Sequence, residues 1–241
     1  MIGEGTRVLL IGEGREYYVR AGKGTLSTDL GTLDLGLLVG AAPGDTVATH
    51  IGKTFSVRTP RAVDHFAHAS RSGAPMLPKD IGTVVAYTGM SRNDDVLDAG
   101  TGSGIAAIYF GGIARSVRTC EVRAEFARQA AKNIEDAQLG NVEVVAGDVL
   151  DASGVYDIVH LDMQIGEAHI VHAHSLLRPG GFLACYTPFI EQMMQAMDAA
   201  SRLFADVHTY EMQEREMTRS ARGTRPATRV GHSGYITIAR R

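Results

Sequence analysis

The sequence predicts an α/β fold, in which a parallel sheet with helices on both faces follows a small β-rich domain. From residue 94 onward, short apolar strands alternate with helical segments, whereas the first 65 residues hold short strands with no helix between them. A hydrophobic content of 44% in 241 residues is enough to fill the cores of such domains. We therefore expect a β-rich domain over residues 1–65 and an α/β domain over residues 66–241.

The N-terminal domain is expected to be a small antiparallel sheet or barrel. Its strands are short and are separated by glycine-containing turns, of which residues 42–45 (Ala-Pro-Gly-Asp) are an example. The expected strands cover residues 8–11, 17–19, 25–28, 46–50 and 54–57.

The α/β domain is predicted from a regular succession of strands and helices. The segment 123–138 repeats apolar residues at intervals of four, which predicts an amphipathic helix. A second helix is expected over 189–203. The expected strands cover residues 95–98, 117–121, 142–145, 156–161, 181–186, 207–214 and 235–239.

Several classes of protein are disfavoured by composition. No apolar run approaches the roughly 20 residues that cross a bilayer, and the N-terminus lacks the pattern of a secretory signal. The two cysteines, Cys120 and Cys185, lie inside apolar runs, so we expect a reduced, cytoplasmic protein. The histidines form no set with cysteine or carboxylate at metal-ligand spacing, so we expect no metal site.

Three glycines, Gly100, Gly102 and Gly104, follow the first strand of the α/β domain. Glycine permits a tight turn and lets the backbone approach a ligand closely, because no β-carbon collides with it. In an open parallel sheet the ligand binds beyond the carboxyl ends of the strands, which is where this turn lies. The glycines alone also fit the relaxed fingerprint of a dinucleotide site.

Acidic residues end the first three strands of this domain, at Asp98, Glu121 and Asp148. A carboxylate at Glu121 is placed to accept the hydroxyls of a ribose, and one at Asp148 to accept a hydrogen bond from an adenine amino group. An acid directly before the glycine turn suits a cationic ligand better than a pyrophosphate. The pattern therefore favours S-adenosyl-L-methionine as cofactor, while the alternative is that Glu121 and Asp148 cap the starts of helices.

Three motifs resemble the TrmI-type tRNA N1-methyladenosine methyltransferases. They are the glycine stretch 96–104 (VLDAGTGSG), the Pro-Lys-Asp at 78–80 and the C-terminal segment 224–235 (TRPATRVGHSGY). The glycine stretch is shared by many methyltransferases, whereas the other two motifs are more specific. Residues 74–77 and 222–226 are most similar to archaeal members.

The resemblance implies a Rossmann-like methyltransferase domain after the β-rich domain, in a homotetramer that methylates an adenosine of the tRNA T-loop. The modified base would be adenine 58, with adenine 57 as a second candidate. Asp162 matches the family's catalytic aspartate, and the resemblance also places it beside the cofactor, with Glu121 at the ribose and Asp148 at the adenine. The methionine end of the cofactor would be held by Gly100, Thr101, Gly102, Ser103, Gly104 and Ile105.

Adenine N1 already carries an in-plane lone pair, so its methylation needs no strong base. A carboxylate such as Asp162 would instead stabilise the positive charge that develops on the ring. The expected tRNA contacts are Lys79, Arg225, Arg229 and His232, with Arg215, Arg219 and Arg222 as further candidates. Two alternatives remain open: a methyltransferase acting on a small molecule or protein, and a non-enzymatic RNA-binding subunit that pairs with a catalytic homologue.

Overall fold

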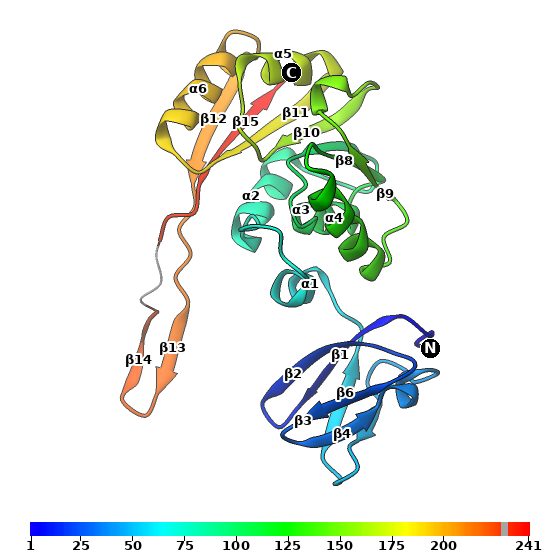
Figure 1. Ribbon diagram of the computed structural model, residues 1–241. Helices are drawn as coiled ribbons and strands as arrows, with labels where there is room; N and C mark the ends of the chain where they lie inside the picture. The colour runs from blue at the N-terminus through cyan, green and yellow to red at the C-terminus, as the bar shows by residue number, and fades with distance from the viewer. Residues whose placement is uncertain (228–230) are drawn as a thin grey trace. The chain divides into compact units, whose positions relative to one another are not determined.

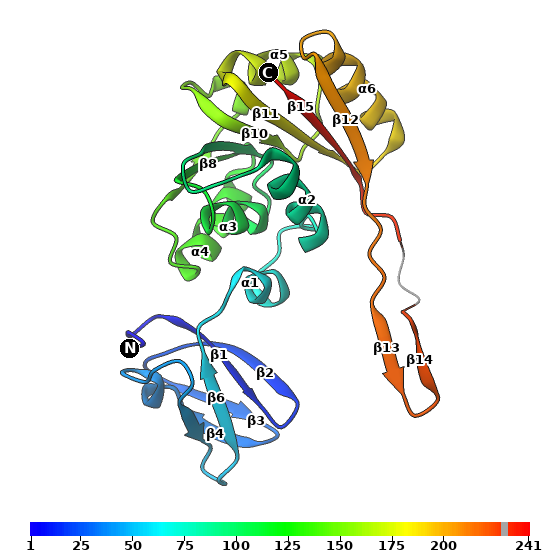
Figure 2. The ribbon, with the colours of Figure 1, turned by 180° about the vertical axis from the view of Figure 1, so that it is seen from behind.

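The computed structural model describes residues 1–227 and 231–241 and divides the chain into two compact units (Figures 1 and 2). Unit 1 comprises residues 1–69 and 135–138, and unit 2 comprises residues 70–134 and 139–241. The boundary that the sequence predicted after residue 65 falls inside helix α1 (Ala62–His68), which ends unit 1.

Unit 1 is β-rich, as predicted. Its main sheet has the order β2-β1-β6-β5 with antiparallel neighbours, and a separate hairpin is formed by β3 and β4. Alternate residues such as Val8, Leu10 and Phe55 are fully buried, because successive side chains of a strand point to opposite faces. The elements are β1 (Arg7–Gly12), β2 (Arg15–Arg20), β3 (Thr25–Thr28), β4 (Gly31–Asp34), a 3-10 turn η1 (Leu35–Leu38), β5 (Thr46–Ala48) and β6 (Thr54–Arg58).

Unit 2 is built on a seven-stranded sheet of order β12-β15-β11-β10-β7-β8-β9. The five strands from β11 to β9 run parallel, and β15 and β12 join antiparallel to their neighbours. The predicted α/β class is therefore confirmed. The strands are β7 (Asp95–Ala99), β8 (Ser116–Glu121), β9 (Val142–Ala146), β10 (Tyr156–Leu161), β11 (Leu177–Thr187), β12 (Asp206–Glu211) and β15 (Tyr235–Arg240).

Helices cover both faces of this sheet, with α2, α3 and α4 on one face and α5 and α6 on the other (Figures 1 and 2). The predicted helix over 123–138 is α4, which buries the apolar stripe Ala127, Ala130 and Ile134. The helices are α2 (Pro78–Thr88), α3 (Ile105–Gly111), α4 (Ala124–Asp136), α5 (Glu167–Leu176) and α6 (Ile190–Ser201), with a 3-10 turn η2 (Val149–Asp151).

A two-stranded hairpin, β13 (Met217–Ser220) and β14 (Gly223–Pro226), lies between β12 and β15 in the sequence. Within residues 1–227 and 231–241 its strands pair only with each other, and every residue in them is exposed. The sequence predicted a strand up to residue 214, but β12 ends at Glu211 and the hairpin was not predicted. Its residues are polar and lack the alternation that marks a half-buried strand.

No helix in the described part of the chain is both long and apolar enough to cross a membrane.

An ion-pair network closes the amino-terminal edge of the parallel sheet. Asp95, at the start of β7, accepts hydrogen bonds from Arg115 and Ser116, and Arg178 bridges it to Asp157. The Arg115 guanidinium holds the pKa of the Asp95 carboxyl well below its usual range. Asp95 therefore stabilises the folded state above the pKa of the unfolded carboxyl, near 3.9, and this contribution is lost as the pH falls below that value.

We expect Asp95→Asn to lower the free energy of unfolding by about 1–2 kcal/mol at pH 7, because the side chain is only 20% exposed and loses charged hydrogen bonds. Urea unfolding at pH 7 and pH 3 measures this, and the deficit should shrink at pH 3. The control is Glu143→Gln, whose ion pair with Arg118 is exposed and is expected to contribute less than about 1 kcal/mol. Equal losses at both pH values would contradict the assignment.

Candidate active site

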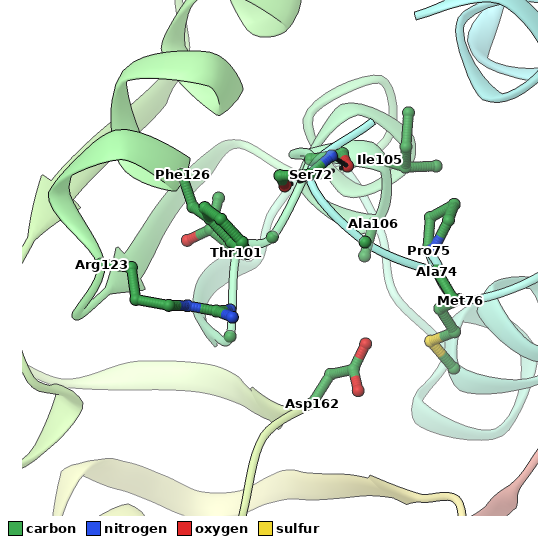
Figure 3. A pocket seen from close by; sticks show the side chains of 14 residues that line it. Ser72, Ala74, Pro75, Met76, Thr101, Ile105, Ala106, Arg123, Phe126 and Asp162 are labelled. Atoms are coloured by element: carbon green, nitrogen blue, oxygen red, sulfur yellow. Dashed lines mark hydrogen bonds between the residues drawn. The ribbon is translucent and has the colours of Figure 1, made fainter. Parts of the chain in front are cut away.

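A pocket of about 250 Å³ lies at the carboxyl ends of the parallel strands. It lies where the strand order reverses between β7 and β10, which is the usual position of a ligand in an open α/β sheet. Asp162 points into it, with Arg123 and Phe126 on one side and Met76 on the other (Figure 3). The lining comprises Ser72, Gly73, Ala74, Pro75, Met76, Gly100, Thr101, Gly102, Ser103, Ile105, Ala106, Arg123, Phe126 and Asp162.

Gly100 brings the glycine loop against the end of β10. Its φ is +85°, and a β-carbon there would lie 1.9 Å from the carbonyl oxygen of Asp162. The sequence interpretation assigned this glycine to close approach of a ligand, but the nearest group is protein backbone. Glycine at this position is what allows the loop after β7 and the acid after β10 to share one pocket.

The other two glycines of the loop serve different purposes. A β-carbon on Gly104 would lie 3.3 Å from the β-carbon of Ala130, so this glycine allows α4 to pack closely, and Gly104 lies outside the pocket lining. Gly102 has a φ of +54°, and a β-carbon there would find only the Gly100 carbonyl oxygen, at 3.8 Å. Gly102 is therefore the member of the three that has open space before it.

Asp162 carries the most distinctive electrostatic environment of the site. Among the described residues, the Asp162 carboxylate has no hydrogen-bond or ion-pair partner, although Asp162 directly follows the buried strand β10. Burial raises its pKa to about 6; His160 opposes this shift, and Asp98 and Asp80 add to it. A carboxylate without a protein partner, held in a pocket, is available to a ligand.

Glu121 ends β8 as predicted, but its carboxylate is 2% exposed and lies outside the pocket lining. It accepts hydrogen bonds from the Gly102 amide at 3.0 Å and from the Arg123 amide and guanidinium at 3.1, 2.8 and 3.3 Å. Burial opposes ionisation of Glu121, but these hydrogen bonds outweigh it and keep its pKa below the ordinary value. Contact with a ribose would require Arg123, which is half exposed, to yield a hydrogen bond.

The structure places the acids that end β7 and β9 outside the pocket lining. Asp98 is buried and is held by Thr119 and His160, both at 2.6 Å, so it belongs to the core beneath the loop. Asp148 is exposed, and one of its oxygens accepts a hydrogen bond from the Leu150 amide at 2.9 Å, as a cap of η2. The alternative that Asp148 caps a helix start thus holds for one of its two carboxylate oxygens.

Lys79 was predicted to contact tRNA, and the structure assigns its ammonium group to internal bonds. Its Nζ donates to Asp80 at 2.6 Å, to the Met212 carbonyl at 2.7 Å and to the Ser233 hydroxyl at 2.6 Å. The side chain is 12% exposed. All three donors of the ammonium are used, so Lys79 is not free to bind phosphate.

His232 was also expected among the tRNA contacts. Its Nδ1 lies 2.7 Å from Glu211 Oε1 and its Nε2 lies 3.0 Å from the Pro188 carbonyl oxygen. Since both partners are acceptors, the carbonyl of Pro188 and the carboxylate of Glu211 raise the pKa of the imidazole. His232 therefore fastens the end of β12 to the loop after β11.

Arg225 lies on the exposed hairpin, together with Arg219 and Arg222, and Arg215 precedes it. Over the stretches that the structure covers, none of these four guanidinium groups has an acidic partner. Arg229, the remaining predicted contact, lies outside the described residues.

Sequence reasoning missed one wall of the pocket. Residues 72–76, Arg123 and Phe126 line the pocket, and none of them was assigned to the site from the sequence. The Arg123 guanidinium lies 3.8 Å from the centre of the Phe126 ring. The proximity of Arg123 to Glu121 in the sequence was a signal for their pairing. No three or more histidine, cysteine or acidic side chains are grouped to hold a metal in the part of the chain that is described.

The family model described as "tRNA methyltransferase complex GCD14 subunit" matches residues 75–228. The TrmI tRNA (adenine(57)-N(1)/adenine(58)-N(1))-methyltransferase of Methanocaldococcus jannaschii is 33% identical over 96% of this chain and 94% of its own length. The chain belongs to this family. The TrmI tRNA (adenine(58)-N(1))-methyltransferase of Thermus thermophilus is 30% identical over 95% of this chain and 94% of its own length.

Solved structures agree with the fold of this tRNA methyltransferase family member. A SAM-dependent O-methyltransferase of Thermotoga maritima superimposes with a TM-score of 0.87 at 26% identity, covering 100% of this chain and 94% of that one. The tRNA (m1A58) methyltransferase TrmI of Aquifex aeolicus gives a TM-score of 0.80 at 23% identity, covering 99% and 98%. The predicted Rossmann-like methyltransferase fold is therefore confirmed.

We expect Glu121→Gln to weaken S-adenosylmethionine binding by at least about tenfold. The amide that replaces one carboxylate oxygen would face the Gly102 or Arg123 N–H donors, and a lost charged hydrogen bond costs about 1.5–3 kcal/mol. Isothermal titration calorimetry measures the change. The matched control is Glu125→Gln, on the exposed first turn of α4, with affinity expected within about twofold of the unmodified protein. Unchanged affinity for Glu121→Gln would remove that carboxylate from the site.

Proposed function

We propose that this protein is a tRNA (adenine-N1)-methyltransferase that uses S-adenosylmethionine to form N1-methyladenosine in the T-loop, at adenine 58 with adenine 57 as a second candidate. The observation that carries the proposal is Asp162. It supplies an unpartnered carboxylate to the pocket beside the glycine loop, in a chain that belongs to a family of tRNA methyltransferases.

The pocket residues fit S-adenosylmethionine. Its lining combines apolar side chains such as Phe126 and Ile105 with the open backbone at Gly102 and the Asp162 carboxylate, which suits a ligand with an aromatic base and a positive charge. We assign residues 100–105 to the methionine part of the cofactor, Glu121 to its ribose and Asp148 to its adenine. When bound, S-adenosylmethionine supplies a methyl group on a sulfonium sulfur.

The chain's contribution to the chemistry is electrostatic. Transfer of the methyl group to N1 of the target adenine would leave a positive charge on the adenine ring. The Asp162 carboxylate, beside N1 and the exocyclic amine, stabilises that charge and can hold a proton of the amine. Because N1 lies on the Watson–Crick edge, the base must leave its stack and enter the pocket, at a cost of a few kcal/mol.

Binding of the tRNA backbone offsets that cost. Four arginines on and before the β13–β14 hairpin form an exposed cationic surface and have no acidic partner in the described part of the chain. We call this surface, made of Arg215, Arg219, Arg222 and Arg225, the arginine segment. Guanidinium groups bind phosphates through two parallel hydrogen bonds, so this surface suits an RNA backbone. We extend the assignment to Arg229, and we propose the homotetramer that the family resemblance implies.

We expect Asp162→Asn to lower kcat for tRNA methylation at least about 100-fold, because the amide cannot offset the developing charge. The dissociation constant for S-adenosylmethionine should change by less than about threefold. With the unmodified enzyme, kcat/KM should fall as the pH drops below about 6, since protonation then neutralises the carboxylate. Single-turnover methylation across pH 5–8 measures both; near-normal rates for the variant would remove Asp162 from the mechanism.

We expect the double variant Arg222→Gln/Arg225→Gln to weaken tRNA binding and to reduce the slope of log affinity against log salt by about 2, because two phosphate contacts are lost. Filter binding at several salt concentrations measures the slope. The control is Arg202→Gln on unit 2, an exposed arginine paired with Glu167, for which no change in slope is expected. An unaltered slope in the double variant would place the tRNA elsewhere.

The substrate assignment is tested directly by incubating the purified protein with labelled S-adenosylmethionine and bulk tRNA, and in parallel with protein and metabolite pools. Mapping the modified nucleotide should give N1-methyladenosine at position 58, or at 57 and 58. Labelling of proteins or metabolites in place of tRNA would support the alternative substrate class. Light scattering of the same preparation tests the tetramer.

A further inference from the structure

Lys79 joins two segments of the chain that lie far from it in the sequence. Its ammonium donates to the Met212 carbonyl, just after β12, and to the Ser233 hydroxyl, just before β15. These two residues begin and end the excursion that carries the arginine segment. The His232–Glu211 pair lies beside the same two points. Two adjacent sets of side-chain bonds, those of Lys79 and those of His232, therefore join the two ends of the excursion at its base.

The same ammonium neutralises a fully buried acid. Asp80 is 0% exposed, and its two oxygens accept hydrogen bonds from Lys79 at 2.6 Å and from the Ser233 hydroxyl at 2.7 Å. A buried carboxylate is tolerated only where it is paired in this way. Lys79, Asp80 and Ser233 thus form a closed polar cluster, which we call the Lys79 cluster.

The Lys79 cluster adjoins Tyr186, the last residue but one of β11, the strand next to β10, which Asp162 follows. A β-carbon on Gly234 would lie 2.5 Å from the Tyr186 ring, so the chain after Ser233 packs directly on that ring. Burial raises the pKa of Tyr186 to about 12, and the carboxylates of Asp80 and Asp162 act in the same direction. The register pairs Leu161 with Cys185, so Asp162 and Tyr186 come next on adjacent strands.

We propose that Lys79 is a positioning residue of the methyl transfer: by joining Met212, Asp80 and Ser233, it holds the base of the arginine-rich excursion against Tyr186, whose strand neighbours that of Asp162. This inference rests on the proposed function, because it concerns the same site. It replaces the phosphate contact that the sequence predicted for Lys79.

Removal of the Lys79 charge has an electrostatic consequence at the site. Asp80, which is fully buried, would lose the cation that pairs with it, and a buried carboxylate without such a partner is unstable as an anion. The other titratable groups around Asp162 are His160 and Asp98 on β10 and β7, and Tyr186 on β11. These groups remain in place in a Lys79 variant.

The test is Lys79→Met, assayed for tRNA methylation beside Arg225→Gln. For Lys79→Met we expect kcat to fall about 10- to 100-fold, while the salt slope of tRNA binding stays within about 0.3 of that of the unmodified protein. For Arg225→Gln the effect should fall on KM, with a slope reduced by about 1. A Lys79→Met variant with a reduced slope and intact kcat, or with no change in either, would overturn the proposal.

Two further measurements guard against misfolding and against failure of the proposed function. Ser233→Ala removes one acceptor and leaves the Lys79–Asp80 pair, and the same changes are expected with smaller size. Hydrogen–deuterium exchange is measured without any substrate, and Lys79→Met should speed exchange around residues 185–187 and 231–235. Unchanged exchange would contradict the proposal that Lys79 holds the base of the excursion in place. If the unmodified protein fails to methylate tRNA while exchange responds as expected, the proposed function is wrong, but Lys79 still holds the base of the excursion in place.

Discussion

The contact between Gly100 and the end of β10 is the constraint on which the site depends. A side chain at Gly100 would overlap the Asp162 carbonyl, so a glycine is needed there for the loop and the acid to line one pocket. Both are carried by central strands whose residues are almost fully buried, and the register pairs Asp98 with His160. The geometry of the pocket is therefore set by the packed core of unit 2, which moves little, and owes less to the loops themselves.

Most of the carboxylates around this contact are neutralised by partners within the protein, and one is not. Asp98 is bonded to Thr119 and His160, Glu121 to Arg123, and Asp80 to Lys79. Asp162 lies among these groups without such a partner in the described chain, and its pKa is raised by burial. An unpaired carboxylate costs stability, and we propose that it is kept because it stabilises a cation that forms on the substrate.

The fold and the location of the site were predictable, whereas the pairing of the charges was not. Strand and helix periods predict the α/β class, and parallel strands bring their carboxyl ends to one edge, so Asp162 and the glycine loop were correctly brought together. Lys79, however, bonds to residues 133 and 154 positions away, and no local pattern reveals such partners. Phe126 fits the apolar period of α4, yet it lines the pocket. It lies in the first turn of the helix, where a side chain can extend beyond the core against which the rest of the helix packs.

The basic groups divide in the same way, into cations that are paired with carboxylates of the protein and cations that are not. Arg115 and Arg178 bond to carboxylates that close the sheet, and Arg123 bonds to Glu121, so these cations are already neutralised. Within the described residues the arginine segment has no such partners, and an exposed row of guanidinium groups attracts a polyanion. Lys79 lies at the junction between that row and the pocket, with its donors used by Met212, Asp80 and Ser233. A cation whose three donors are used within the protein has none left for phosphate, so under our proposal Lys79 acts by holding the arginine segment and the pocket in one fixed relation.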